Sequence, residues 1–187
     1  MRLLRSRLEA AQLPPAGEVM ARWDSESHEL RDQMDRLFQR AVAQSSTGGR
    51  LQLFSSLIGQ LVPDEARILA ALSDGRSAAV VHVVSRSARG RRVLENASSI
   101  GRAAGVALPH LVTTYVTHLL HLGLVELGPE EPDLEGEYEL LMAETVVREA
   151  LAQGRRTGRL APRVVKETVK LSPLGAELWA ASRNGAI

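Results

Sequence analysis

The segment with the clearest chemical content is residues 108–122, a predicted helix whose outward side chains form hydrogen bonds without carrying permanent charge. Its apolar residues recur every three or four positions, which predicts one face turned to a core and the opposite face turned outward. The outward face carries His110, Thr114, Thr117 and His121, flanked by Thr113 and His118. Of these, His110, Thr113, Thr114 and Thr117 are the candidate contacts to the edges of DNA bases. A solvated face or a protein contact surface is the alternative, because this helix has no arginine or lysine to neutralise phosphates.

Positive charge for a nucleic-acid or other anionic partner would come from arginines elsewhere in the chain. The candidates are Arg86, Arg89, Arg91, Arg92, Arg102, Arg155, Arg156 and Arg159. The planar fork of arginine suits phosphate oxygens, although a solvated hairpin tip explains the four arginines of the loop 85–92 equally well. Residues 126–139 contain seven acids and no base. They would repel a duplex if they lay on the same side as the arginines.

Metal binding and catalysis have weak support. His118 and His121 lie one helical turn apart and could share a metal ion, but a chance pair on a polar face is the favoured interpretation. Gly101 and Gly105 lack the spacing of dinucleotide-binding and phosphate-binding loops, and the zinc-protease and serine-nucleophile motifs are missing. We therefore expect no catalytic residue, no metal and no cofactor.

These polar residues lie in residues 94–127, which are expected to fold as a helix, a tight turn, a second helix and a short strand. Gly105 would end the first helix, Pro109 would open the second, and Gly123 would end it. Leu124 to Leu127 would follow as the strand. The order is that of a winged helix.

The strand of the wing has a predicted partner in residues 163–171, whose side chains alternate between apolar and polar. A helix at 138–153 would be inserted between the two strands. The expected fold class is therefore mainly α, with a winged-helix domain (α+β, small wing sheet) over residues 50–187 and an N-terminal helical extension over residues 1–49. Tyr115 is expected to form a hydrogen bond through its hydroxyl at the edge of the core.

Local signals predict the remaining elements. Pro63 is typical of a first helical position, and Ser172 followed by Pro173 is typical of a helix start. The expected helices cover residues 2–12, 51–61, 63–72 and 173–183, the expected strand covers 79–84, and the expected irregular segments are a polar hinge at 45–49 and a basic, flexible stretch at 154–162.

The N-terminal extension contains a long amphipathic helix over residues 20–44. Its apolar stripe is nearly a heptad repeat and consists of Trp23, Leu30, Met34, Leu37 and Ala41. We expect this stripe to form a homodimer contact, and the alternative is that it packs on the helices of its own chain.

Composition excludes several classes of protein. The chain has no cysteine, which excludes disulfides and thiolate metal sites and favours a reducing compartment. No apolar run approaches the roughly 18 residues of a membrane span, and the N-terminus has no secretory pattern. We expect a soluble, cytoplasmic protein without a membrane partner.

Three stretches carry a family resemblance: Pro63-Asp-Glu-Ala-Arg-Ile-Leu, then Tyr115 with Leu119, Leu122 and Gly123-Leu-Val, then Val169-Lys-Leu-Ser-Pro-Leu-Gly. Over residues 20–180 the chain resembles the abortive-infection alpha family of bacterial proteins. The resemblance implies a bacterial cytoplasmic protein associated with defence against phage, and it brings no catalytic residues. The Leu-Gly-Leu-Val ending is also similar to winged-helix regulators of the multiple-antibiotic-resistance type.

The function expected from the sequence is that of a noncatalytic winged-helix binding protein in phage defence or a stress response. The alternative is a DNA-binding transcriptional regulator that uses the 108–122 helix and the basic loops. The expected partners are a second copy of the chain and either another protein or double-stranded DNA.

Overall fold

The structure is a computed structural model that describes residues 16–86, 92–157 and 160–184. Within these ranges the chain forms eight α-helices, two short 3₁₀ helices and one four-stranded antiparallel sheet. The mainly helical α+β composition predicted from the sequence is therefore confirmed. The chain divides into two compact units between Leu51 and Gln52. The helix predicted at residues 2–12 lies outside the described residues.

The first unit contains α2 (Ala16–Ala43) and the beginning of α3 (Ser46–Ile58). The predicted hinge at 45–49 was wrong, because α3 already begins at Ser46. The Ser45 hydroxyl accepts a hydrogen bond from the Gly48 N–H at 3.1 Å. This N-cap starts the helix in spite of the two glycines that follow.

The second unit is built on the sheet, whose strand order is β2-β1-β4-β3. The strands are β1 (Ala78–Val84), β2 (Arg92–Ser98), β3 (Val125–Gly128) and β4 (Arg163–Leu171). The β-branched sequence of β1 suits its central position, where its residues are buried by helices on both faces. The predicted pairing of the strand after Gly123 with residues 163–171 is confirmed, with Val125 opposite Leu171.

The helix predicted from residue 94 to the turn at Gly105 was wrong. Residues 92–98 form the edge strand β2, and only the four residues of α5 (Ile100–Ala103) are helical. Strand β2 pairs with β1, but Glu95 and Asn96 both oppose His82, which makes a β-bulge. The bulge interrupts the alternation of apolar and polar residues by which a strand is recognised in a sequence. The strand conformation of this segment therefore comes from its pairing with β1.

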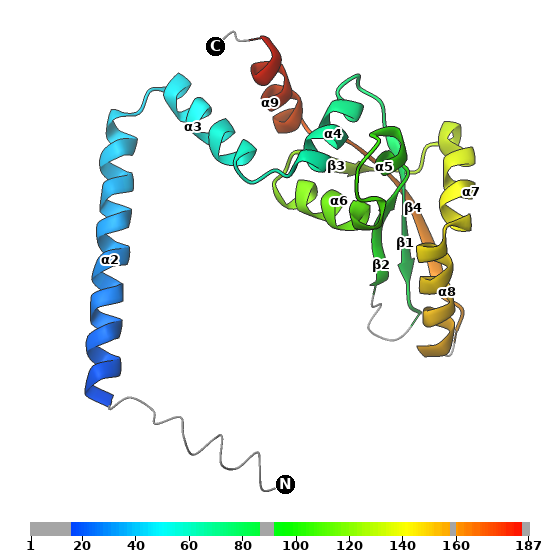
Figure 1. Cartoon of the computed structure of the whole chain (residues 1–187), viewed down its shortest axis with the longest axis horizontal. Coiled ribbons are helices and arrows are strands. Elements are labelled where there is room, and N and C mark those ends of the chain that lie inside the picture. The colour runs from blue at the N-terminus through cyan, green and yellow to red at the C-terminus, as the bar shows by residue number, and fades with distance from the viewer. Residues whose placement is uncertain (1–15, 87–91, 158–159, 185–187) are drawn as a thin grey trace, which may run out of the picture. The chain divides into compact units, whose positions relative to one another are not determined.

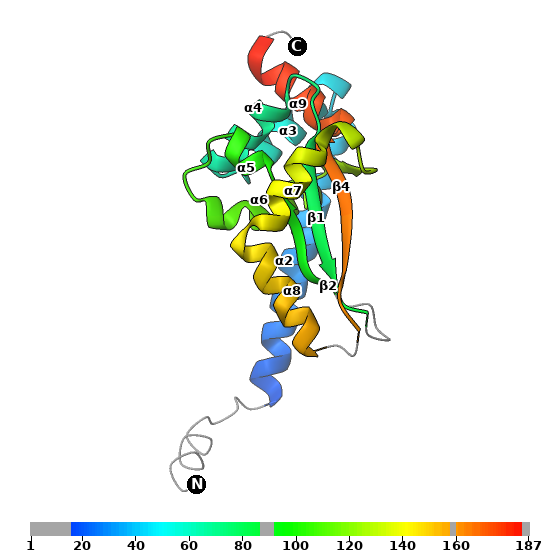
Figure 2. The ribbon, with the colours of Figure 1, turned by 90° about the vertical axis from the view of Figure 1, so that its right-hand side faces the viewer.

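Helices cover both faces of the sheet, which Figure 1 shows nearly edge-on. One face packs against α4 (Pro63–Leu72), α6 (Val112–His121) and α9 (Pro173–Asn184). The other face packs against α7 (Glu135–Ala143) and α8 (Thr145–Thr157), which stand in front of the sheet in Figure 2. The 3₁₀ helices η1 (Pro109–Leu111) and η2 (Pro132–Leu134) precede α6 and α7.

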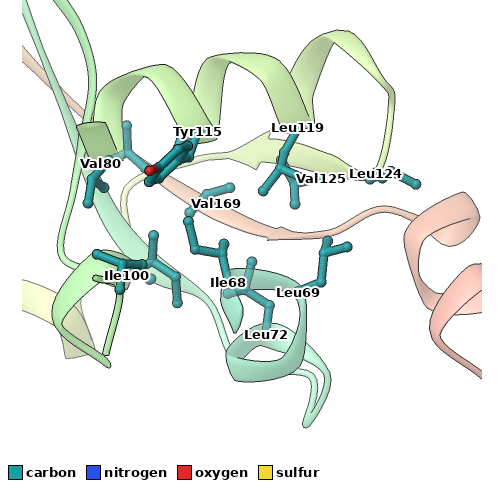
Figure 3. Packing of buried hydrophobic residues seen from close by; sticks show 14 of the residues in the cluster. Ile68, Leu69, Leu72, Val80, Ile100, Tyr115, Leu119, Leu124, Val125 and Val169 are labelled. Atoms are coloured by element: carbon teal, nitrogen blue, oxygen red, sulfur yellow. The ribbon is translucent and has the colours of Figure 1, made fainter. Parts of the chain in front are cut away.

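The orientation predicted for the 108–122 helix is confirmed. Tyr115, Val116 and Leu119 are buried against Ile68 of α4 and the sheet. Figure 3 shows Tyr115 and Leu119 projecting from α6 toward Ile68 and Val169. This apolar contact leaves the opposite face of α6 for polar residues.

The helix predicted at 138–153 is two helices in the structure. The chain is extended at Glu144, with a ψ of 145°, and this residue separates α7 from α8. Helix α8 continues to Thr157, so the first four residues of the stretch predicted to be flexible, from Gly154, are helical. Within the described ranges, no helix has the length and apolar character that crossing a membrane requires.

Helices α4 and α9 begin where the sequence predicts. Pro63 is the first residue of α4, and the Glu65 carboxylate accepts the Val62 N–H at 3.0 Å. The Ser172 hydroxyl accepts the Gly175 N–H at 2.9 Å and donates to the Gly123 carbonyl at 2.5 Å. Ser172 therefore caps α9 and also fixes the turn between α6 and β3.

Candidate functional site

Arginines from four elements gather at one end of the sheet, which we call the basic end. Val84, the last residue of β1, lies between Arg92 of β2 and Arg163 of β4 in the strand register. Arg86 follows β1 after one residue. Only residues 158–162 separate the end of α8 from Arg163, so the last turn of α8 is held at the same end. The basic end consists of Arg86, Arg92, Arg155, Arg156 and Arg163.

The arginines of the basic end are exposed and mostly free of carboxylates. Arg92 lies 3.8 Å from Glu95 of its own strand. Among the described residues, no carboxylate lies within ion-pairing distance of the other four. Arg155 and Arg156 also complement the negative end of the α8 dipole. That role leaves their guanidinium groups available to a partner.

The acidic segment, residues 126–139, lies toward the opposite end of the sheet, where five of its seven carboxylates have partners. Lys166 of β4 contacts Glu135 at 3.0 Å and Glu130 at 3.3 Å, and its hydrogen bond to Glu135 is the main reason that the pKa of Lys166 is raised. Lys170 contacts Glu126 at 3.3 Å. These are the two lysines of the chain, and both are used here.

Other acidic side chains fasten this segment to the start of β1. Glu131 accepts the Ser77 hydroxyl at 3.0 Å, and Glu137 accepts the Ser99 hydroxyl and, at 3.3 Å, the Ala79 N–H. The nearest of the acids, Glu130 and Glu135, contact Lys166, three residues from Arg163 along β4, or about 10 Å. The Debye length is about 8 Å at physiological salt, so repulsion from these acids is largely screened at the basic end.

The polar residues of the 108–122 helix divide into outward and inward groups. His110 and Thr114 are exposed, whereas Thr113 and Thr117 are half-buried. Thr113, Thr114 and Thr117 sit along a shallow groove of 400 Å³ between α6 and β2, which is also lined by Val93, Leu94, Glu95, His118 and His121. His110 instead lines a separate cavity of 480 Å³. The β2 side of the groove starts next to Arg92, so α6 presents its polar side chains close to the basic end.

A chain of buried hydrogen bonds runs beneath this groove. The His82 side chain, 1% exposed, accepts the Asn96 N–H at Nδ1 (3.1 Å) and contacts the Glu167 carboxylate through Nε2 (2.9 Å). Since Nδ1 accepts, the ring proton lies on Nε2 and is donated to Glu167. The Asn96 amide donates to the Thr117 hydroxyl at 2.8 Å, and this hydroxyl donates to the Thr113 carbonyl at 2.7 Å. These bonds tie α6 to all three strands β2, β1 and β4.

Asn96, a member of this hydrogen-bond network, has a strained backbone. Its φ of 57° lies in the left-handed region, and within the described ranges it is the one residue other than glycine with a positive φ. The side-chain oxygen of Asn96 is buried and is the one such atom of the described residues without a hydrogen-bond partner. Sequence reasoning missed His82 and Asn96, because their partners are distant in sequence.

A second buried polar cluster joins α4 to α6. Asp64 accepts the N–H groups of Ala107 at 2.9 Å and Leu108 at 3.0 Å, and it accepts the Tyr115 hydroxyl at 3.3 Å. The hydrogen bond from Ala107 is the largest cause of a lowered pKa at Asp64. The predicted hydrogen bond of the Tyr115 hydroxyl is therefore confirmed.

The two histidines weighed as metal ligands have different surroundings. His118 Nδ1 lies 2.8 Å from the carboxylate of Glu65, a residue that is 2% exposed, whereas His121 is exposed. Within the described part of the chain, no three histidine, cysteine or carboxylate side chains gather as a metal site would require. The contact with Glu65 gives His118 a structural role between α4 and α6.

The remaining predicted contact residues lie away from the basic end or outside the described residues. Arg102 of α5 contacts Glu144 at 3.1 Å, in the wall between cavities of 480 and 360 Å³. Arg89, Arg91 and Arg159 lie outside the described residues. The nucleic-acid contacts as a whole stay a prediction. The sequence did not single out Arg163, which the strand register places between β1 and α8.

The predicted dimer contacts belong to α2 in the first unit. Trp23, Leu30, Met34 and Leu37 are between 47% and 67% exposed, and Ala41 is exposed as well. The dimer itself stays a prediction.

Comparison with known proteins identifies the family. A solved structure, that of an uncharacterized protein from the hydrocarbon-degrading marine bacterium Alcanivorax borkumensis SK2, matches with a TM-score of 0.62 and 34% sequence identity. The match covers 74% of this chain and 98% of that one. No curated protein matches the chain. The family model described as abortive infection alpha matches residues 7–182, and the chain therefore belongs to the abortive infection alpha family.

Proposed function

We propose that this protein is a noncatalytic nucleic-acid-binding component of a bacterial response to phage, and that the basic end contacts phosphates. Membership of the abortive infection alpha family suggests the link to phage infection. The observation that carries the binding step is the set of four exposed arginines without a carboxylate partner among the described residues, supplied by β1, α8 and β4 or the residues next to them.

The composition of the basic end favours a phosphate backbone over other anionic partners. All its cations are arginines, whose planar guanidinium groups match phosphate oxygens in a bidentate way. Among the described residues, the basic end has no aromatic side chain on which a base could stack. Its composition therefore favours contacts with the phosphate backbone over stacking with the bases of a single strand. We therefore expect binding to duplex nucleic acid that is strongly salt-dependent and independent of sequence.

The transcriptional regulator is the second candidate function. It rests on the groove between α6 and β2, which starts beside Arg92 and presents Thr114 and His121. In this winged-helix interpretation, α6 would read base edges while the basic end neutralised phosphates. Thr117 is already bonded to Asn96 and His118 to Glu65, which leaves few free groups for base recognition. The proposal therefore favours backbone contacts.

A titration of the full chain against duplex DNA at several salt concentrations tests the proposal. The variant Arg155→Ala/Arg156→Ala removes two cations of the basic end. The matched control, Arg76→Ala/Arg183→Ala, removes two arginines that already contact Asp74 and the Trp179 ring. Each phosphate contact contributes about 0.9 to the slope of log affinity against log salt. The first variant should lower that slope by about 2, and the control should leave it unchanged.

Each outcome decides between the candidates. Equal salt slopes for the two double variants would overturn the assignment of the basic end, because the loss of affinity would then depend on net charge alone. Binding that prefers one sequence and depends on Thr114 would replace the proposal with the regulator. Absence of binding at low salt, with the fold intact by circular dichroism, would reject nucleic acid as the partner.

A further inference from the structure

Helix α2 exposes an apolar stripe that its own unit leaves uncovered. Besides the residues predicted as dimer contacts, the exposed apolar side chains of α2 include Met20 and Phe38. The rest of the helix surface is mostly charged or polar, and beside the stripe Arg22 contacts Glu26 at 2.8 Å. A helix of 28 residues with one apolar side and one charged side is typical of a coiled-coil strand.

The stripe follows a heptad repeat across three repeats. Met20, Ser27, Met34 and Ala41 occupy a positions, and Trp23, Leu30 and Leu37 occupy d positions. The steps between successive positions alternate between three and four residues, which is the spacing that keeps a seam on one side of two supercoiled helices. Leucine occupies two of the three d positions, as it does in two-stranded coiled coils.

The charges beside the seam distinguish the two orientations of such a pair. In a parallel pair in register, each g position faces the e position five residues later in the partner. This places Glu26 opposite Arg31 of the second copy, twice per dimer, with no pair of like charges. In an antiparallel pair that aligns residues 23–41, Glu26 would face Arg40 but Arg31 would face the second Arg31. In the antiparallel register that aligns residues 20–37, Arg31 would face Asp24 and Glu26 would face Gln33, so the contact between Glu26 and Arg31 belongs to the parallel pair.

We propose that two copies of this chain associate through α2 as a parallel, two-stranded coiled coil. The occupant of the stripe is a second copy because the Glu26 and Arg31 positions are complementary to themselves in this arrangement. Ser27 is a polar residue at a central a position, and such a residue favours a defined register at a cost in stability. The dimer would bring two basic ends to one nucleic acid, which raises the apparent affinity through effective concentration.

Sedimentation of the full chain without nucleic acid tests the dimer independently of the proposed function. Arg31→Glu should weaken the dimer about tenfold, because two exposed attractions become two repulsions. Glu26→Arg/Arg31→Glu should restore it by exchanging the two charges. The control Arg36→Glu makes the same charge change at a c position, outside the seam and its flanks, and should leave dimerisation within about threefold of the parent.

The same measurement separates the competing arrangements. Weakening by Arg40→Glu but not by Arg31→Glu, or failure of Glu26→Arg/Arg31→Glu to restore the dimer, would replace the parallel pair with an antiparallel one. Leu30→Asn/Leu37→Asn should give a monomer, and circular dichroism should show that the second unit stays folded. A parent chain that is monomeric at tens of micromolar, or a dimer that survives these two substitutions, would overturn the proposal.

Discussion

The two ends of the sheet carry opposite charges and use them in different ways. At the acidic end, the carboxylates of residues 126–139 contact Lys166, Lys170 and the hydroxyl groups of Ser77 and Ser99. At the basic end, four of the five arginines have no carboxylate within ion-pairing distance among the described residues. Five of the seven carboxylates at the first end have partners within the fold, whereas four arginines at the second are available to a partner.

This difference shows why net charge says little about the binding surface of this chain. The formal net charge is only +1, yet the acids of residues 126–139 have two lysines and several hydrogen-bond donors as partners, whereas four arginines of the basic end have no carboxylate partner among the described residues. Lys166, which contacts Glu130 and Glu135, lies three residues from Arg163 along β4, or about 10 Å. This is about one Debye length at physiological salt, so a change of charge at one end should act only weakly on the other.

The largest expected effect comes from removing the apolar contact that supports both ends. Leu119 is fully buried between α6, α4 and the sheet, so Leu119→Ala should lower the free energy of unfolding by roughly 2–5 kcal/mol. Denaturant unfolding measures this loss, and Thr114→Ala on the outward face of α6 is the control. A loss below about 1 kcal/mol for Leu119→Ala would mean that the inner face of α6 is assigned wrongly.

The local signals explain which parts of this architecture the sequence predicted. Pro63, Gly123 and Ser172 mark the ends of helices through backbone geometry and capping, which depend on neighbouring residues alone. The alternation in β4 likewise reflects its pleat. Strand β2 was missed because a bulge at Asn96 interrupts its alternation, and its strand geometry comes from pairing with β1.

The candidate site was predictable in composition but not in arrangement. Arg86, Arg92, Arg155 and Arg156 could be counted from the sequence, and the structure places them at the same end. The contacts of Lys166 with Glu130 and Glu135 join residues about 30 positions apart. Such long-range pairs leave no periodic signal, so the sequence could not show that the acidic segment already has partners within the fold.

The next largest effect is expected when the loop that follows β1 loses its charges. Arg89→Ala/Arg91→Ala/Arg92→Ala should lower the salt slope of duplex binding by up to about 3, at about 0.9 for each phosphate contact. Thermal stability should change little, because Arg92 is exposed and its carboxylate contact is long, at 3.8 Å. If the triple variant binds duplex DNA as the parent chain does, these three arginines make no contact with phosphates.

Two charge reversals on β4 sharpen the comparison between the ends. Lys166→Glu would place a carboxylate among Glu130 and Glu135, so it should lower the unfolding midpoint and leave duplex binding nearly unchanged. Arg163→Glu, three residues away, should do the reverse. Thermal unfolding and a salt-dependent binding titration on both variants test whether one variant loses stability while the other loses binding. Equal losses of stability for both would show that the arginines of the basic end also serve the fold.

The smallest effect concerns acid pH, which removes charge from carboxylates but leaves arginines charged. The N–H of Ala107, followed by that of Leu108, holds the pKa of Asp64 below its ordinary value in the folded chain. The stabilisation from Asp64 is therefore complete above the unfolded pKa of about 3.9 and is lost as the pH falls through the lower folded pKa. Asp64→Asn should weaken this part of the pH dependence of the free energy of unfolding, because the amide does not take up a proton in this pH range. Urea unfolding of both proteins between pH 6 and about pH 3 measures the slopes. If the slopes are the same, Asp64 does not contribute to the acid response, and the cause must lie among the carboxylates at the acidic end.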